Sequence, residues 1–536
     1  MPVDPISLQV FKSKFESVAE EMGVALQRTA YSPNIKERRD FSCAVFDPEG
    51  NMVAQAADIP VHLGAMPASV KAALQVFPNA LNPGDIVILN DPYQGGSHLP
   101  DITMVAPIYS EQDGKRELVG FVANRGHHAD VGGMTPGSLP LSTELYQEGT
   151  IIPPVKLARR GRLNQEIIQL ICRHSWTPEA RKGALAAQTA AIKVGEQRMR
   201  DVTERYGLPD TLAHMSALLD YSERVTRRAI SKIPDGHYEL LDHMDDDGLT
   251  QENVPIKVAI TISGEEMQID FTGTSAQRPG CINAPVAVTV SACLYVVRCL
   301  LDEQAPANQG CLRPLTIITP LGSLVNPEPQ RGVAAGNVET SQRITDVLLG
   351  AMAQALPGVI PAASQGTMNN LLIGGHDLGR DKPFVYYENI AGGMGARPDK
   401  DGISGIHTHM TNTMNTPIEA LEFAFPLRLK QYAIRRGSGG PGKFNGGDGL
   451  IRDVEFLGAA RVTLLSERRK LPPPGSKGGS HAHPGENVLF KSGYEEIKLS
   501  GKETIDVSSG DILSIRTPGG GGWGNQDPPS VELHEH

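Results

Sequence analysis

The first part of the chain carries a helical and then a strand-like pattern of apolar positions. Asp4-Pro5 is typical of a helix start, and the apolar residues after it recur three or four positions apart: Phe11, Phe15, Val18, Met22 and Leu26. This spacing predicts an amphipathic helix over about residues 5–29. Apolar runs of strand length come next, at 41–46, 52–57, 86–89, 102–108 and 117–123. We therefore expect residues 1–160 to form a helix packed on a mostly antiparallel sheet.

The middle of the chain combines long helical patterns with strictly alternating ones. Two helical patterns, over about 177–206 and 210–231, predict a helical hairpin within residues 161–235. Beyond it, alternation of apolar and polar residues indicates strands with one covered face, and further helical patterns follow. The strands are expected at 256–262 and 267–271, and the helices near 286–303 and 339–356. We predict an α+β domain over residues 236–430.

The C-terminal part is rich in glycine and carries only short strand patterns. Such patterns occur at 461–465, 497–499 and 512–515. They predict a β-rich module over residues 431–524, followed by a tail over 525–536. At 536 residues the chain is too long for one hydrophobic core. The predicted fold class is α+β, with several layers of mixed, largely antiparallel sheets, long helices and the β-rich C-terminal module.

Composition and charge exclude several classes of protein. With 40% apolar and 21% charged residues the chain can bury cores, and its net charge of −11 comes without a Lys/Arg cluster that would bind nucleic acid. The longest apolar windows, 286–301 and 347–363, are interrupted by Arg or Pro, so we expect no membrane span. No signal peptide is visible, and the six cysteines form no CxxC pair. We therefore expect reduced thiols and a cytoplasmic location.

Two short loops concentrate residues that bind metals. His98 and Asp101 lie in the first loop, and His127 and His128 lie in the second. If the flanking strands form a hairpin around Asp113-Gly114, a strong turn signal, then Asp101 faces Gly126 and His127 faces Pro100. Opposed residues in an antiparallel pair lie close together. His98, Asp101 and either His127 or His128 are thus predicted to meet at the open end of this hairpin.

A second hairpin is expected to add a carboxylate to the same site. Pairing around the turn at 47–51 places Asp40 opposite Asp58. Two imidazoles with one or two carboxylates suit Zn, Mn or Fe, and they leave a coordination position open for water or substrate. A metal there would supply Lewis acidity and a hydroxide near neutral pH. The alternative is a set of solvated loop residues, and for Asp58, Asp91 and Asp130 taken singly a supporting role is favoured.

Weaker signals elsewhere favour structural roles. The segment 437–444 fits GxGxxG, but Phe444 stands where a P-loop needs a hydroxyl and no helix follows, so we interpret it as turn-rich backbone. The run 518–524 is expected to form a tight loop against another chain or site. His407 and His409 are a weaker metal candidate beside the favoured polar-loop interpretation. Ser341 lacks the GxSxG elbow of a serine hydrolase, so a catalytic serine is poorly supported. Cys172 lies near His174 on an apparently helical stretch, where a packing role is favoured over catalysis.

Several long motifs together resemble the hydantoinase B / 5-oxoprolinase family. The resemblance covers nearly the whole chain in order, with motifs at 40–43, 90–101, 126–133, 336–343, 435–440 and 517–522. It implies an ATP-dependent cyclic amidase that hydrolyses a hydantoin, 5-oxoproline or a lactam. In such enzymes a partner A subunit with an ATPase fold uses ATP and Mg to phosphorylate the amide oxygen. The B subunit then carries the metal that hydrolyses the activated ring.

The resemblance also implies site residues and an assembly. The metal ligands would be Asp40, His98, Asp101 and His127, and the catalytic group would comprise His98, Asp101, His127 and His128. A hetero-oligomer of A2B2 type is implied, and Glu148 and Arg39 are candidate substrate contacts. Related ATP-dependent carboxylases of acetone and acetophenone share the two-part arrangement and are the rival enzyme class. The rival outside enzymes is a scaffold subunit without catalysis.

Overall fold

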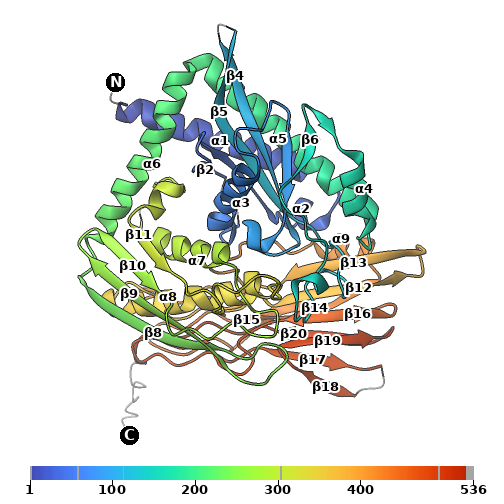
Figure 1. Cartoon of the computed structure of the whole chain (residues 1–536). Coiled ribbons are helices and arrows are strands. Elements are labelled where there is room, and N and C mark those ends of the chain that lie inside the picture. The colour runs from blue at the N-terminus through green and yellow to red at the C-terminus, as the bar shows by residue number, and fades with distance from the viewer. Residues whose placement is uncertain (1–2, 57–58, 113, 302–304, 493–494, 527–536) are drawn as a thin grey trace.

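The computed structural model describes residues 3–56, 59–112, 114–301, 305–492 and 495–526. In Figure 1 the N-terminal elements lie at the top, the C-terminal strands at the bottom, and helices α7 (Val286–Cys299) and α8 (Ser341–Ala355) between them. Four sheets are present in the described residues, and β10–β11 is the one parallel pair among their named strands. This arrangement confirms the predicted α+β class with layered, largely antiparallel sheets.

The N-terminal layer is a seven-stranded antiparallel sheet with helices on both faces. Its strand order is β2-β1-β5-β4-β3-β6-β7. The strands are β1 (Phe41–Phe46), β2 (Met52–Gln55), β3 (Ile86–Leu89), β4 (Asp101–Gln112), β5 (Lys115–His127), β6 (Val155–Arg159) and β7 (Arg162–Leu163). The short helices α2 (Pro33–Lys36), η1 (Pro92–Gln94) and η2 (Leu145–Gln147) lie in its loops. This layer contains both the helix and the strands that the sequence pattern indicates for the first part of the chain.

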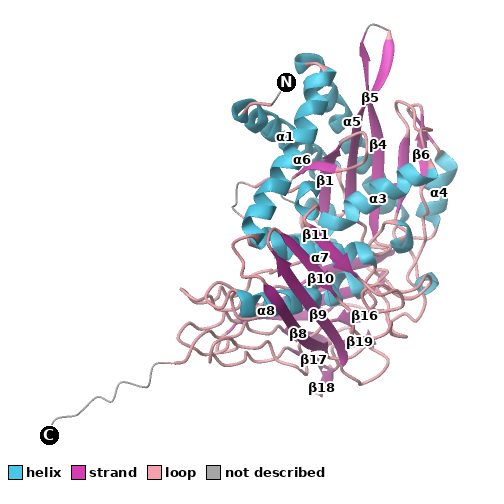
Figure 2. Ribbon diagram, turned by 60° about the vertical axis from the view of Figure 1, so that its left-hand side comes forward, coloured by secondary structure: helices cyan, strands magenta, loops and turns pink. Residues whose placement is uncertain are grey.

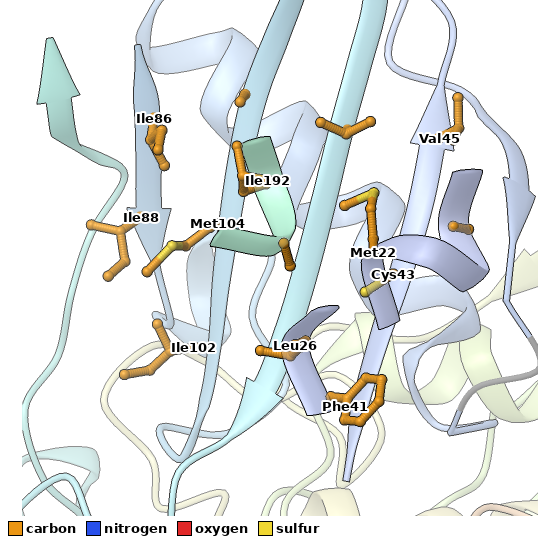
Figure 3. Close-up of a cluster of buried hydrophobic side chains, with 14 of the residues drawn as sticks. Met22, Leu26, Phe41, Cys43, Val45, Ile86, Ile88, Ile102, Met104 and Ile192 are labelled. Carbon is orange, nitrogen blue, oxygen red and sulfur yellow. The ribbon is translucent and has the colours of Figure 1, made fainter. Parts of the chain in front are cut away.

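Helix α1 (Pro5–Thr29) begins and packs as its sequence predicts. The Asp4 carboxylate accepts hydrogen bonds from the backbone N–H groups of Ile6 and Ser7, which caps the helix. Its apolar face packs with α5 (Pro178–Tyr206) against one face of the sheet, as Figure 3 shows for Met22, Leu26, Met104 and Ile192. Helix α3 (His62–Val76) packs in a separate apolar cluster on the other face.

The middle of the chain contains a helical hairpin and a four-stranded sheet. Helices α5 and α6 (Leu208–Ile230) form the hairpin, preceded by α4 (Gln165–Arg173). The sheet, with strand order β11-β10-β9-β8, is visible at the front of Figure 2. Its strands are β8 (Gly236–Met244), β9 (Val254–Ser263), β10 (Glu266–Asp270) and β11 (Leu315–Ile318), and the 3-10 helix η3 (Gln309–Leu312) precedes β11. A π-helical turn, η4 (Gly336–Thr340), leads into α8.

The C-terminal part forms two antiparallel sheets that share an apolar core. The first has the order β13-β12-β16-β19 and consists of β12 (Asn370–Asp377), β13 (Lys382–Asn389), β16 (Ala460–Leu465) and β19 (Lys502–Val507). The second has the order β14-β15-β20-β17-β18 and consists of β14 (Leu427–Arg435), β15 (Gly449–Phe456), β17 (Glu486–Phe490), β18 (Glu496–Leu499) and β20 (Ile512–Arg516). Helix α9 (Ile418–Ala424) precedes β14. The three short strands expected here are confirmed.

Glycine-rich segments of this part pack backbone against backbone. Gly440 donates from its N–H to the carbonyl of Gly520, and Gly520 donates to that of Gly447. A Cβ atom on Gly446 would lie 1.7 Å from the carbonyl oxygen of Gly520, so a side chain has no room there. The segment 437–444 is therefore structural backbone, as expected. The run 518–524 approaches other glycine segments of the same chain.

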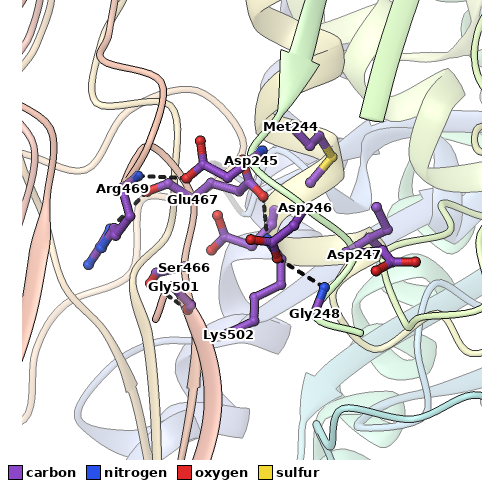
Figure 4. A network of polar contacts seen from close by, with 12 residues as sticks. Met244, Asp245, Asp246, Asp247, Gly248, Ser466, Glu467, Arg469, Gly501 and Lys502 are labelled. Carbon is purple, nitrogen blue, oxygen red and sulfur yellow. Dashed lines mark hydrogen bonds and ion pairs between the residues drawn. The ribbon is translucent and has the colours of Figure 1, made fainter. Parts of the chain in front are cut away.

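Buried charges join β8 to the C-terminal sheets, as Figure 4 shows. Glu467 contacts the ammonium group of Lys502 and accepts a hydrogen bond from the backbone N–H of Asp245. Asp245 in turn accepts from the backbone N–H of Arg469 at 2.6 Å. These pairs hold the two regions together because each buried charge has a partner of opposite sign or a donor. None of the helices in the described residues is long and apolar enough to cross a membrane.

Candidate metal centre

Asp101 and His127 face each other at the open end of the β4–β5 hairpin. The sequence predicted Asp101 opposite Gly126, and this pairing is wrong by one residue. A bulge between Ile108 and Tyr109 of β4 leaves one extra residue in β5, next to Gly120. Gly120 has φ +151° and its α-carbon lies against the Phe46 carbonyl, where a Cβ would be 2.1 Å from the oxygen. The shift moves His127 directly opposite Asp101.

Three imidazoles surround the buried carboxylate of Asp101. Its Oδ1 lies 3.2 Å from His98 Nε2 and 3.1 Å from His127 Nδ1. Its Oδ2 lies 3.3 Å from Nε2 of a third histidine, His62, at the start of α3. Burial disfavours the ionised carboxylate, but His98, His62 and His127 lower the pKa of Asp101 well below its usual value. The Asp101 side chain is therefore a buried anion surrounded by imidazole nitrogens.

Asp40 lies beside this group, just before β1. The backbone N–H of His127 donates to the Asp40 carbonyl at 3.0 Å, and the Asp40 side chain lines the same cavity as His98, Asp101 and His127. Arg38, fully buried, lies 3.7 Å from the Asp40 carboxylate. The predicted pairing partner Asp58 lies outside the described residues. The strand pairing of β1 with β2 shifts register at Phe46, so the simple hairpin count does not extend to Asp40.

The donor atoms fit a small divalent cation. Atoms bound to one ion at about 2.0–2.2 Å lie about 3–3.5 Å apart, which matches the two distances at Asp101 Oδ1. The ring nitrogens near Oδ1, His98 Nε2 and His127 Nδ1, are therefore the ones that could bind the ion. The other nitrogen of each ring is buried without a hydrogen-bond partner among the described residues. The cavity measures about 20 Å³, enough for an ion or one water. Of the described residues, only His98, Asp101 and His127 form a group of three or more ligands close enough to share one ion.

Three residues that the sequence placed near the site, His128, Asp91 and Asp130, do not line the cavity. His128 points to Gln188, with its Nε2 2.9 Å from Gln188 Oε1, so the geometry favours His127 as the ligand. Asp91 caps the short helix η1 by accepting from the Tyr93 N–H. Asp130 accepts from Ser175 Oγ and the Trp176 N–H, and burial raises its pKa. These three side chains stabilise the loops that carry the cavity.

Glu148 is buried but does not line the cavity, whereas Arg39 is exposed. Oε1 of Glu148 accepts from Ser142 Oγ and from the N–H groups of Val333 and Ala334. Its Oε2 has no hydrogen-bond partner in the described part of the chain. Burial raises the pKa of Glu148 to about 7, although these three donors and His98 favour the ionised form. Glu148 therefore holds the segment that leads into η4.

Sequence reasoning missed four residues of the cavity or its surroundings: His62, Asn337, Tyr387 and Arg38. Asn337 lies in the π-helical turn η4, and its Nδ2 is 3.3 Å from His98 Nε2. The Tyr387 ring stacks on His127 with centroids 4.7 Å apart, and the Arg38 guanidinium lies 4.6 Å from the centroid of the same Tyr387 ring. Of these four residues, only Asn337 lies in one of the sequence motifs. The π turn falls within the 336–343 motif, which was the one available signal.

The weaker sequence candidates do not form a second centre in the described residues. His409 has φ +59°, so the segment bends between the two histidines, and its Nδ1 lies 3.4 Å from the Tyr295 hydroxyl. Burial lowers the pKa of His407 to about 3. Ser341 donates to the Asn337 carbonyl at 2.7 Å. Cys172 lies in α4 and packs against the apolar core.

The candidate centre is a buried group of nitrogen and oxygen donors on a layered α+β scaffold, and comparison with known proteins identifies the family of the chain. The model of the hydantoinase B/oxoprolinase family matches residues 4–526. The chain belongs to this family, which confirms the resemblance seen in its motifs. A 5-oxoprolinase of Dictyostelium discoideum is 40% identical over 529 residues, which cover 98% of this chain and 41% of the relative. The chain thus spans less than half the length of that relative.

Two solved structures share the fold. The ATP-dependent caprolactamase from Pseudomonas jessenii is 28% identical, with a TM-score of 0.90 over 98% of this chain and 92% of its own. An acetone carboxylase is 18% identical, with a TM-score of 0.88 over 97% of this chain and 76% of its own. At this identity the carboxylase shows a shared fold alone.

Proposed function

We propose that this chain is the metal-dependent subunit of an ATP-dependent cyclic amidase. It would hydrolyse the ring amide of a hydantoin, 5-oxoproline or a lactam after a partner A subunit has phosphorylated the amide oxygen. The convergence of His98, Asp101 and His127 with Asp40 on one cavity carries this proposal. Relatives named 5-oxoprolinase and caprolactamase support the substrate class.

The chemistry explains why phosphorylation comes first. An amide is stabilised by resonance, and this stabilisation is lost once its oxygen carries a phosphoryl group. Water can then add to the ring carbon, the ring C–N bond breaks, and a proton passes from the water to the nitrogen. A second water releases phosphate from the resulting acyl phosphate. The products are the ring-opened amino acid, ADP and phosphate.

The four ligands would be Asp40, His98, Asp101 and His127, which is a donor set that suits Zn, Mn or Fe. When bound, the ion supplies Lewis acidity and lowers the pKa of water. Asn337 lines this cavity, and its Oδ1 atom is buried without a partner among the described residues, so it can accept a hydrogen bond from the reactant. His128 holds Gln188 and is assigned an orienting role.

A reactant must displace part of the cavity wall. The volume of about 20 Å³ holds an ion but no ring. Ile59, Val61, Met410 and Thr411 line the cavity and come from segments without helix or strand. Such segments move more readily than the sheet that carries the ligands.

ATP would bind the partner. This chain corresponds to 41% of the length of the Dictyostelium relative, so that protein has further residues available for an ATPase. We propose an A subunit on a separate chain, a hetero-oligomer of A2B2 type, and Mg-ATP bound by the A subunit. The six cysteines form no disulfide among the described residues, and we propose a reducing compartment such as the cytoplasm.

Elemental analysis and a substrate screen of the A–B complex test this function. We expect about one divalent metal per B chain and ATP-dependent opening of a cyclic amide. His98→Ala should lose the metal and at least about 100-fold in turnover, whereas His237→Ala, at an exposed histidine paired with Glu239, should change neither. Wild-type turnover by His98→Ala would indicate a scaffold. Bicarbonate-dependent consumption of a ketone would indicate a carboxylase instead.

A further inference from the structure

The two oxygens of the Asp101 carboxylate have different surroundings. Oδ1 faces His98 and His127, the proposed metal ligands, at 3.2 and 3.1 Å. Oδ2 faces away from them and accepts a hydrogen bond from Ser97 Oγ at 2.7 Å, with His62 Nε2 at 3.3 Å. One oxygen is thus directed to the ion site, and the other is held by the protein.

His62 differs from the other two imidazoles in having partners for both ring nitrogens. It is buried at the first position of α3, and its Nδ1 lies 2.8 Å from Ser42 Oγ. A neutral imidazole that accepts from the Ser42 hydroxyl and donates from Nε2 to Asp101 satisfies every contact. His98 and His127 each keep one buried ring nitrogen that lacks a partner in the described residues. His62 therefore needs no ion to complete its hydrogen bonds.

The second donor to Oδ2 is also anchored. Ser97 Oγ accepts from Arg125 Nη1 at 3.2 Å, and Arg125 is fully buried. Arg125 further donates from Nε to Thr103 Oγ1 at 2.9 Å and from Nη2 to Ser69 Oγ at 2.8 Å. The outer oxygen of Asp101 is thus held from α3 through His62 and from β5 through Ser97 and Arg125.

We propose that His62 is a positioning residue that orients Asp101 for metal binding without being a ligand. This inference rests on the proposed function, because it assumes that Asp101 binds the ion. Removal of the His62 donor leaves Oδ2 with Ser97 alone, and the carboxylate can then rotate about its Cβ–Cγ bond. Loss of such a supporting contact weakens metal binding by about 10–100-fold.

Metal affinity of the purified chain tests the proposal without any substrate. Zn²⁺ affinity is measured by competition with a chelating dye, and the visible spectrum of the Co²⁺-loaded protein reports the ligand geometry. His62→Leu should bind Zn²⁺ about 10–100-fold more weakly and show an altered Co²⁺ spectrum. His62→Gln should recover most of the affinity, because its amide can donate to the same oxygen.

His214→Gln is the matched control. His214 is also buried with both ring nitrogens partnered, by Ser7 and the Asp210 carbonyl, but it stacks on Phe11 away from the cavity. Its substitution should leave both metal readouts unchanged. If His62→Leu does not fold, Ser42→Ala removes the partner of Nδ1 and should weaken Zn²⁺ binding several-fold.

Three results would overturn the proposal. If His62→Leu has the Zn²⁺ affinity and the Co²⁺ spectrum of the wild type, His62 only packs against its neighbours and does not orient Asp101. Complete loss of binding in both His62→Leu and His62→Gln would make it a ligand. A wild-type chain that binds neither Zn²⁺ nor Co²⁺ would refute the proposed metal centre itself. This failure can be told apart from failure of the His62 proposal, because it is seen in the wild type before any variant is measured.

Discussion

Substitution of one glycine in the C-terminal backbone cluster should destabilise that part of the protein strongly. In Gly446→Ala the new Cβ would lie 1.7 Å from the carbonyl oxygen and 2.4 Å from the carbonyl carbon of Gly520. Both neighbours are backbone atoms, so no side chain can rotate away. An added methyl in a packed core costs about 1–3 kcal/mol when side chains adjust, and here we expect at least about 3 kcal/mol.

Thermal unfolding followed by tryptophan fluorescence measures this effect. The chain has two tryptophans, Trp176 and Trp523, and Trp523 forms a β-bridge with Phe444 inside the glycine cluster. A Trp176→Phe background isolates the signal of this cluster. If the two C-terminal sheets melt as one unit of roughly 150–250 residues, 1 kcal/mol corresponds to roughly 2–4 °C, so Gly446→Ala should lower the Tm of this unit by at least about 6 °C.

Gly458→Ala provides the matched control for the same chemical change. A Cβ on Gly458 meets no atom within 4 Å, so Tm should stay the same or rise by the equivalent of up to about 1 kcal/mol. A Gly446→Ala protein that melts within about 1 °C of the wild type would refute the reasoning, because it would mean that the packed backbones can separate at little cost.

Two further predictions concern buried charges. Burial raises the pKa of Glu148 from 4.5 to about 7. Ionisation of Glu148 therefore lowers the free energy of unfolding of the wild type as pH rises from 4.5 to 7. Glu148→Gln avoids this loss, so its free energy of unfolding should rise by about 3 kcal/mol relative to wild type over this range. Paired melts across pH measure this, and parallel profiles would contradict it. Arg452→Leu should cost about 3–5 kcal/mol, because it leaves Glu388 buried without its partner, and adding Glu388→Leu should restore most of the loss. Chemical unfolding of both variants tests this, and equal stability of the single and double variants would contradict it.

The long helices could be predicted because their signals are local. Asp4 caps α1, and the apolar spacing behind it continues to Leu26 without interruption, so α1 begins and ends where the pattern does. The pattern over 339–356 identified α8 but not the π-helical turn before it, since residues 336–340 differ from an α-helix only in their hydrogen bonding. That turn directs Asn337 towards His98.

The candidate metal centre could be predicted only in part, because its residues meet through tertiary structure. The hairpin turn identified the correct pair of strands, and a single bulge at Gly120 moved the pairing by one residue. His62 follows no motif and reaches Asp101 only because α3 packs on the sheet. A lone histidine in an apolar segment offers no signal of this contact.

The proposed ligands and the rest of the cavity wall come from distant parts of the chain. The proposed ligands lie between Asp40 and His127, in or next to the strands of one sheet, whereas most of the remaining wall comes from residues 337–413. Tyr387 joins the two by stacking on His127. Ligands on a rigid sheet keep their geometry while loops adapt to different reactants. Under the proposed function, the preference for one ring amide over another should therefore depend on the wall at 337–413, because the proposed ligands contact only the amide group that all these substrates share.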